Sequence, residues 1–331
     1  VYRSSISQGY KDHCRNMAID LKERFGLTNK SFHIDIAGND CALLSEFKNV
    51  IGCDILNVDP AKNLAGICMA ANIPSLNLFW GLDAAKQIIN SGNPKADLIT
   101  ATNVFAHVDD VSDFIKGVKY ILKENGHLVL EFPYLINFIE GKEFDTIYFE
   151  HLSYFLINPI KLLCEKEGLK IERVESHPIH GGSVRVFIGN GKEDETVYNF
   201  LESEHRYRSI NPYMEFAREI KRVISDFRLN ISKLSNIAAF AASAKGNTLL
   251  NSSGITVGKI RYIVDETPEK IGKFSPGTHI PIVSMLDLQR TPPDYLLILS
   301  WNFAEEIMDK CRKAGYNSKF IIPIPEFKII E

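Results

Sequence analysis

The residues FDTIYFEHLSYF, at positions 144–155, place a glutamate, a histidine and two tyrosines among large apolar side chains. A histidine with a pKa near ~6.5 can accept a proton at neutral pH, a carboxylate can orient its ring, and phenols can hold substrate oxygens. The zinc spacing H-E-x-x-H is absent. The residue types therefore predict acid–base chemistry by His151, assisted by Glu150, Tyr148 and Tyr154, with a purely structural histidine as the alternative.

A second polar group follows the first predicted strand, in the turn DIAGNDCALL at positions 35–44. A dinucleotide site would need G-x-G-x-x-G there, but only Gly38 is present, and Asp40 would repel a phosphate. Asp59 ends the second predicted strand, where an acidic side chain takes ribose hydroxyls. This favours a ligand with a ribose, a cationic end and no phosphate, namely S-adenosylmethionine. The alternative is an ordinary strand–helix turn with Asp40 as the N-cap.

Two further turns carry polar residues. ATNVFAHVDD places Asn103 at the end of the fourth predicted strand, where we expect it along the cofactor, whereas His107 suits packing equally well. AASAKGNTLL places Lys245 and Gly246 at the start of a helix, which predicts a phosphate or diphosphate site without the Walker A spacing. A capped helix with a surface lysine explains the same residues.

The composition is that of a globular protein. The chain has 331 residues, 45% of them hydrophobic and 24% charged, which predicts two domains. A net charge of −3 gives no electrostatic footprint for nucleic acid or an anionic membrane. The six cysteines are scattered without a C-x-x-C, which favours buried, reduced thiols in a cytoplasmic protein over a disulfide framework.

Apolar runs alternate with segments of helical spacing, which predicts an α/β fold with a parallel, doubly wound sheet. LKIERVES and SVRVFIGN have no helix between them and predict an antiparallel end strand. We predict a cofactor-binding domain at 1–192, a helical connector at 193–234 and a second, smaller Rossmann-like domain at 235–331.

The stretch EFPYLINFIEGKEFDTIYFEHLSYF, followed by HPIHGGSVRVF, resembles the signature of the sugar C-methyltransferase family. DIAGNDCALL, NVDPAKN, ATNVFAHVDD, AKGNTLLN and YLLILSWNFAEEI are similar to that family in the same order. The resemblance covers essentially the whole chain from Tyr2. It implies a class I methyltransferase fold and transfer of a methyl group from S-adenosylmethionine to a ring carbon, generally C3, of a nucleotide-linked 4-keto-deoxysugar through an enolate.

The resemblance also implies roles for individual residues. His151 corresponds to the general base, beside Glu150 and Tyr148 of the same motif and Tyr2 of the entry segment YRSSISQGYKDH. Together with the turns described above, the expected cofactor residues are Asp35, Ala37, Gly38, Asn39, Asp40, Asp59 and Asn103, and the expected substrate residues are Tyr154, His180, Gly181, Lys245 and Asn247.

Three departures from the family pattern stand out. Phe149 replaces a histidine of many relatives, so that position cannot take part in acid–base chemistry. Cys41 replaces the usual glycine, which narrows the cofactor loop. The four-cysteine zinc domain with which the family normally begins is absent, whether trimmed away or missing from this lineage, so we expect no metal in these 331 residues.

Two other classes stay open on the sequence. Two α/β halves would also suit an NAD-dependent nucleotide-sugar oxidoreductase or epimerase, although neither half contains G-x-G-x-x-G. Phe149 and Cys41 would also suit a catalytically inactive binding homologue. We expect a monomer or small homo-oligomer in the cytoplasm, with no nucleic-acid or membrane partner.

Overall fold

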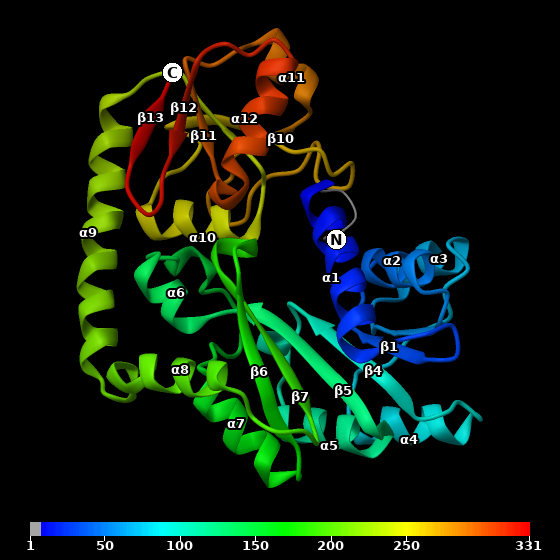
Figure 1. Ribbon diagram of the computed structural model, residues 1–331. Coiled ribbons are helices and arrows are strands. Elements are labelled where there is room, and N and C mark those ends of the chain that lie inside the picture. Colours follow the sequence, from blue (N-terminus) through cyan, green and yellow to red (C-terminus); the bar gives the residue numbers. More distant parts are fainter. Residues whose placement is uncertain (1–7) are drawn as a thin grey trace. The chain divides into compact units, whose positions relative to one another are not determined.

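The computed structural model describes residues 8–331, which form two compact units (Figure 1). The N-terminal unit comprises the described residues up to Tyr134 together with Leu152–His205. The C-terminal unit comprises Leu135–His151 together with Arg206–Glu331. The division at 1–192, 193–234 and 235–331 stays a prediction from the sequence, and the two units named here follow the packing of the chain.

A seven-stranded sheet forms the centre of the N-terminal unit, in the order β3-β2-β1-β4-β5-β7-β6. Neighbouring strands from β3 to β5 are parallel, whereas β7 runs antiparallel to both β5 and β6. This confirms the predicted doubly wound sheet and its antiparallel strand, which lies one place in from the edge. The strands are β1 (Phe32–Ile36), β2 (Asp54–Val58), β3 (Ser75–Leu76), β4 (Ala96–Thr102), β5 (Leu122–Pro133), β6 (Lys170–His177) and β7 (Ser183–Gly189).

The helices of this unit bury one face each against the sheet or a neighbouring helix. In α1 the buried side chains are Cys14, Met17, Ala18 and Leu21, which recur at the spacing of one helical face and pack in one cluster with Phe47 of α2. The helices are α1 (Gln8–Phe25), α2 (Ala42–Val50), α3 (Lys62–Ala70), α4 (Leu82–Asn90), η2 (Phe105–His107), α5 (Val111–Ile121), α7 (Ile157–Lys166), η4 (Ile179–Gly181) and α8 (Glu195–Ser203), with η5 (His205–Arg208) at the boundary.

The C-terminal unit contains a six-stranded sheet in the order β10-β9-β8-β11-β12-β13, parallel except for β13. This confirms the second α/β sheet expected from the sequence. The strands are β8 (Ile237–Phe240), β9 (Ile260–Val264), β10 (Ile282–Val283), β11 (Tyr295–Ile298), β12 (Lys319–Ile322) and β13 (Lys328–Ile330). The helices are α6 (Leu135–Glu140), η3 (Phe144–Thr146), α9 (Asn211–Lys233), α10 (Ala244–Ser253), α11 (Met285–Arg290), η6 (Trp301–Phe303) and α12 (Ala304–Lys313).

Two segments outside the predicted second domain complete its core. The long helix α9 buries Ile220, Phe227 and Ile231 in the same apolar cluster as Leu249 of α10. Phe144, at the start of η3, enters this cluster as well, although it precedes α9 by many residues. The segment 135–151, which carries the predicted base, is therefore built onto the C-terminal unit.

We predict that Phe227→Ala destabilises the C-terminal unit by ~3–5 kcal/mol, because a fully buried phenylalanine leaves a cavity when it is truncated. The free energy of unfolding, measured in urea, checks this. Leu229→Ala on the same helix is the matched control, since Leu229 is 55% exposed. If both variants lost the same free energy of unfolding, Phe227 would not be packed in the core as described.

Candidate active site

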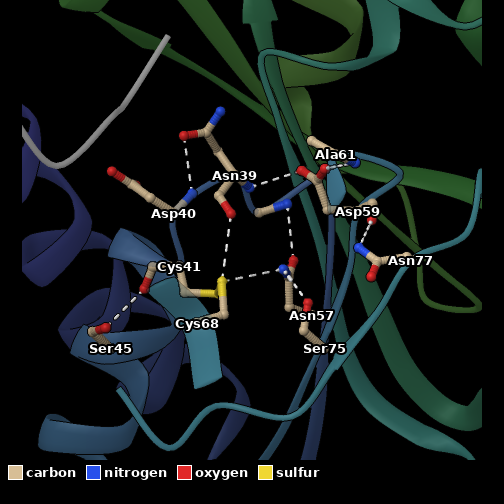
Figure 2. The surroundings of a disulfide bond; sticks show 11 residues. Asn39, Asp40, Cys41, Ser45, Asn57, Asp59, Ala61, Cys68, Ser75 and Asn77 are labelled. Carbon is tan, nitrogen blue, oxygen red and sulfur yellow. Dashed lines mark hydrogen bonds between the residues drawn. A yellow bond between two sulfur atoms is a disulfide. The ribbon is translucent and has the colours of Figure 1, made fainter. Parts of the chain in front are cut away.

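The loop after β1 is the centre of the predicted cofactor site, and side chains from β2 and its loop hold it (Figure 2). The backbone N–H of Asn39 donates to Asp59 Oδ2 at 3.0 Å, and that of Ala61 donates to Asp59 Oδ1 at 2.7 Å. The N–H of Gly38 donates to Asn57 Oδ1 at 3.2 Å. Asp59 therefore ties together the loops that follow two neighbouring strands.

Three residues of this loop have positive φ without being glycine, namely Ala37 at 55°, Asn39 at 53° and Cys41 at 62°. Such conformations are rare outside glycine and cluster at functional sites, where the surrounding structure enforces them. Gly38 is required for a different reason: a Cβ there would lie 2.5 Å from Asp35 Oδ2. The glycine thus makes room for protein side chains rather than only for a ligand.

Three carboxyl groups, those of Asp35, Asp40 and Asp59, are buried in or beside the loop. Acidic side chains here disfavour a phosphate and suit a ligand with a positive charge. Each oxygen of Asp59 accepts one backbone N–H and retains a lone pair that a ribose hydroxyl could use. The residues present therefore fit S-adenosylmethionine and do not fit a dinucleotide.

Asp35 ends a chain of buried polar side chains that joins strands β1 and β4. His33 Nε2 lies 2.7 Å from Thr100 Oγ1, which donates to Asp35 Oδ1 at 2.6 Å. Burial raises the pKa of Asp35 to about 7, with the Asp59 charge adding to the effect and the hydrogen bond from Thr100 opposing it. Burial also lowers the pKa of His33 to about 3, so this imidazole is neutral.

A disulfide joins Cys41, the last residue of the loop, to Cys68 of α3 (Figure 2). The expectation of six reduced thiols is therefore wrong for this pair, while Cys14, Cys53, Cys164 and Cys311 are free and buried. The two cysteines are 27 positions apart and become neighbours only because α2 and α3 follow adjacent parallel strands. The disulfide fixes the start of α2 against the helix that follows Asp59.

A buried ion network on the same sheet was missed by the sequence analysis. Glu131 Oε2 accepts from Arg185 Nε at 2.9 Å and Nη2 at 2.8 Å, and Glu131 Oε1 lies 2.7 Å from His13 Nε2. Burial alone would raise the pKa of Glu131, but the hydrogen bond with His13 and the Arg185 charge lower it to about 2. One charge inside each of two apolar strands, VLEFP and SVRVF, was the available signal, since buried charges require partners.

The other predicted residues of the N-terminal unit take various positions. Asn103, with φ 55°, donates its backbone N–H to Glu131 O at 2.7 Å. Tyr154 is partly buried, and Gly181 ends η4 with φ 90°. His180 belongs to η4 through its backbone, and Tyr2 lies outside the described residues.

The geometry of His151 is fixed within the C-terminal unit. Its Nδ1 lies 2.8 Å from the carbonyl oxygen of Thr146, and its Nε2 lies 3.0 Å from Tyr148 Oη. Because a carbonyl oxygen only accepts, Nδ1 carries the hydrogen, and Nε2 then presents a lone pair to the Tyr148 hydroxyl. The imidazole is therefore held as the tautomer whose basic nitrogen is Nε2.

Glu150 does not take part in this arrangement. Its side chain is exposed, and within residues 8–331 it has no hydrogen bond or ion pair. The group that orients the imidazole is the Thr146 carbonyl, and Glu150 stays a predicted site residue. Phe149 is 87% exposed, so the departure from the family at this position leaves an apolar ring on the surface of its unit.

Lys245 and Asn247 lie at the N-terminus of α10. Ser243 caps this helix, since its side chain accepts from the Gly246 N–H at 3.1 Å. Lys245 is mostly buried rather than a surface lysine, and its Nζ lies 3.4 Å from Glu143 Oε2. The Asn247 side chain accepts from Asn251 Nδ2 at 3.2 Å. Neither predicted substrate contact is tested by these distances.

Among residues 8–331, no three histidine, cysteine, aspartate or glutamate side chains gather as metal ligands would. Within the same range, no helix combines the length and apolar character needed to cross a bilayer.

Comparison with known proteins matches both halves of the chain. Residues 10–174 match the model of a methyltransferase domain, and residues 178–325 match that of the C-methyltransferase C-terminal domain. The C-methyltransferase NovU of Streptomyces niveus is 32% identical over 340 residues, which cover 99% of this chain and 80% of NovU.

Solved structures are more distant. Magnesium protoporphyrin IX methyltransferase of Synechocystis PCC 6803, determined with bound SAM, is 12% identical with a TM-score of 0.41 and covers 54% of this chain and 78% of that one. The cyclopropane synthase MmaA2 of Mycobacterium tuberculosis is 16% identical with a TM-score of 0.38 and covers 48% and 62%.

The disulfide predicts a count of reactive thiols. Alkylation of the denatured, unreduced protein should label four of the six cysteines, and prior reduction should raise the number to six, as read by mass spectrometry. Cys68→Ser should lower the free energy of unfolding by ~3–4 kcal/mol, because the loop closed by the disulfide becomes unconstrained in the unfolded chain. Cys53→Ser serves as the control, and six labels without reduction would contradict the disulfide.

The raised pKa of Asp35 predicts a pH dependence of stability. Because the folded pKa of about 7 exceeds the unfolded value, this carboxyl stabilises the fold at low pH, and its contribution is lost as the pH rises from ~4 through 7. Asp35→Asn keeps an acceptor for Thr100 but carries no charge. Its free energy of unfolding, relative to wild type, should therefore rise by up to ~1.4 kcal/mol per pH unit between about pH 5 and 7.

Urea unfolding at several pH values checks this prediction. The control is Asp83→Asn, at a position whose side chain is 99% exposed, and it should leave the pH dependence unchanged. If the free energy of unfolding changed with pH equally in wild type and Asp35→Asn, burial would not raise the pKa of Asp35.

Proposed function

The chain belongs to the C-methyltransferase family, and we propose that it methylates a ring carbon, C3, of a nucleotide-linked 4-keto-deoxysugar. It is an enzyme, a methyltransferase that uses S-adenosylmethionine, as its methyltransferase domain and its relative indicate. The alternatives of an NAD-dependent oxidoreductase and of an inactive homologue find no support in the cofactor loop or in the geometry of His151. Cytoplasmic location and a monomeric or small oligomeric state remain proposals.

The proposal is carried by one observation, the fixed tautomer of His151. A carbon next to a ketone has an acidic hydrogen, and a neutral imidazole with its lone pair on Nε2 is suited to remove it. The Thr146 carbonyl holds the opposite nitrogen and stabilises the imidazolium that forms when the proton arrives. The sugar, its keto group and the methylated carbon are inferred from the family resemblance.

Tyr148 has a second role in this proposal. Its hydroxyl donates to His151 Nε2 when no substrate competes for it, as the distance of 3.0 Å indicates. When a sugar oxygen accepts the same hydroxyl hydrogen, Nε2 is released for proton transfer, and the phenol stabilises the developing enolate oxygen. Glu150, being exposed, is proposed to act only on the imidazolium charge. Phe149 has no acid–base role.

The cofactor residues are those of the loop after β1. Asp59 would hold the ribose hydroxyls, while Asp35 and Asp40 would face the cationic part of the molecule, with Asn103 alongside. When bound, S-adenosylmethionine supplies an electrophilic methyl group on a sulfonium.

To test the base, the exchange of the sugar C3 hydrogen with solvent deuterium should be measured together with methyl transfer. His151→Gln should lower both rates by ~10²–10⁴-fold, the usual contribution of general base catalysis. Affinity for S-adenosylmethionine, measured by calorimetry, should not change. His205→Gln, at an exposed histidine, is the matched control. Normal exchange by His151→Gln would remove this residue from the mechanism.

A further inference from the structure

A cluster of buried charges lies beside the base and has no role in the proposed chemistry. Glu143 and Asp145 are 3% and 0% exposed, and they flank Phe144 in the turn η3. Lys245 Nζ reaches Glu143 Oε2 at 3.4 Å from the start of α10, and it lies 4.9 Å from the centre of the Trp301 ring. Trp301 Nε1 donates to Asp145 Oδ2 at 2.7 Å from η6.

The same turn carries the carbonyl that orients His151. Thr146 follows Asp145 directly, and its N–H and Oγ1 donate to Glu143 O at 3.0 and 2.9 Å. Its own carbonyl oxygen holds His151 Nδ1 at 2.8 Å. Two acidic side chains held from other elements and the buried Phe144 ring therefore act on the imidazole through the Thr146 carbonyl.

Because Glu143 and Asp145 are buried, this arrangement depends on the positive charge of Lys245. A buried carboxylate is costly unless donors or cations surround it. Burial raises the pKa of both Glu143 and Asp145, and the Lys245 charge opposes that rise in each case. Asp145 Oδ1 is buried and has no hydrogen-bond partner among residues 8–331. Removal of the ammonium would leave two buried acids without a counter-charge, and the turn would have to move or take up protons.

The surroundings of Lys245 also bear on its predicted role as a diphosphate contact. A diphosphate at the N-terminus of α10 would approach Glu143 and Asp145, whose charges repel it. The ammonium is already engaged by a carboxylate and by the face of an indole ring. These contacts are intramolecular and need no ligand.

We propose that Lys245 and Trp301 are positioning residues for His151: by holding Glu143 and Asp145 they keep the Thr146 carbonyl on Nδ1, and Lys245 does not bind the nucleotide diphosphate. This inference rests on the proposed function of His151 as the base. It assigns the C-terminal unit a part in orienting the catalytic group, in addition to any part in holding the nucleotide.

Steady-state kinetics separate the two roles of Lys245. Lys245→Met should lower kcat and the C3 exchange rate by ~10–100-fold, since a small misplacement of a catalytic group has an effect of this size. KM for the nucleotide sugar should stay within about twofold of wild type. Trp301→Phe, which keeps an aromatic ring but loses the hydrogen bond to Asp145, should show the same pattern. The exposed Lys273→Met is the control in the same unit.

A rescue variant distinguishes positioning from simple loss of folding. Glu143→Gln combined with Lys245→Met removes both charges of the pair, so that Glu143 no longer lies buried without its counter-charge. This double variant should recover part of the kcat lost by Lys245→Met, since only Asp145 then lacks its counter-charge. Recovery is not expected if Lys245 contacts a phosphate, because the lysine is still missing.

A spectroscopic measurement needs no substrate at all. The ¹⁵N spectrum of the histidines should show the Nδ1–H tautomer for His151, identified by the signal that His151→Gln removes. Lys245→Met should change this signal and leave the other histidine signals in place. If the tautomer changes but wild type neither exchanges nor methylates the sugar, the proposed function fails and the positioning contact stands. An unchanged His151 signal, an unrescued double variant, or a tenfold rise in KM at normal kcat would overturn the positioning role.

Discussion

A carboxylate can be buried only where donors or cations meet it, and this constraint shapes both units. In the N-terminal unit Asp59 accepts two backbone N–H groups and thereby joins the loops after β1 and β2. Glu131 is met by Arg185 from the neighbouring strand. In the C-terminal unit Glu143 is met by Lys245. In the cases of Asp59 and Glu143 the hydrogen-bonded partners also hold a loop in place.

The imidazole of His151, the proposed base, is oriented through Nδ1 by a backbone carbonyl. The residue beside it in the sequence, Glu150, suggested a carboxylate–histidine pair, because that pair is common and the two residues are adjacent. In the structure the backbone carbonyl of Thr146 orients the imidazole. A carbonyl cannot donate, so it selects one tautomer at every pH at which the ring is neutral. A carboxylate in its place would add a full negative charge beside the imidazole and raise its basicity further.

Periodicity in the sequence was enough to predict both sheets, because strand and helix spacings are local properties. The class of cofactor was also predictable, since Asp40 and the lone Gly38 disfavour the phosphates of a dinucleotide. The contact between Lys245 and Glu143 was not, because it joins residues 102 positions apart through packing. The Cys41–Cys68 disulfide was missed because its 27-residue separation has no recognisable spacing. A local sequence pattern does not indicate which sheet a segment packs against. The packing of residues 135–151 in the C-terminal unit was therefore not predictable either.

The cofactor loop and the proposed base are each held in one conformation by contacts within the protein. The cofactor loop holds three non-glycine residues at positive φ, and Cys41, the last of them, is tied to α3 by the disulfide. The base is held in one tautomer by a turn whose two acids are anchored from α10 and η6. A site that is already oriented loses little entropy and needs little reorganisation in the transition state. The buried charges that make these loops costly to fold are therefore the same groups that hold the loops in place.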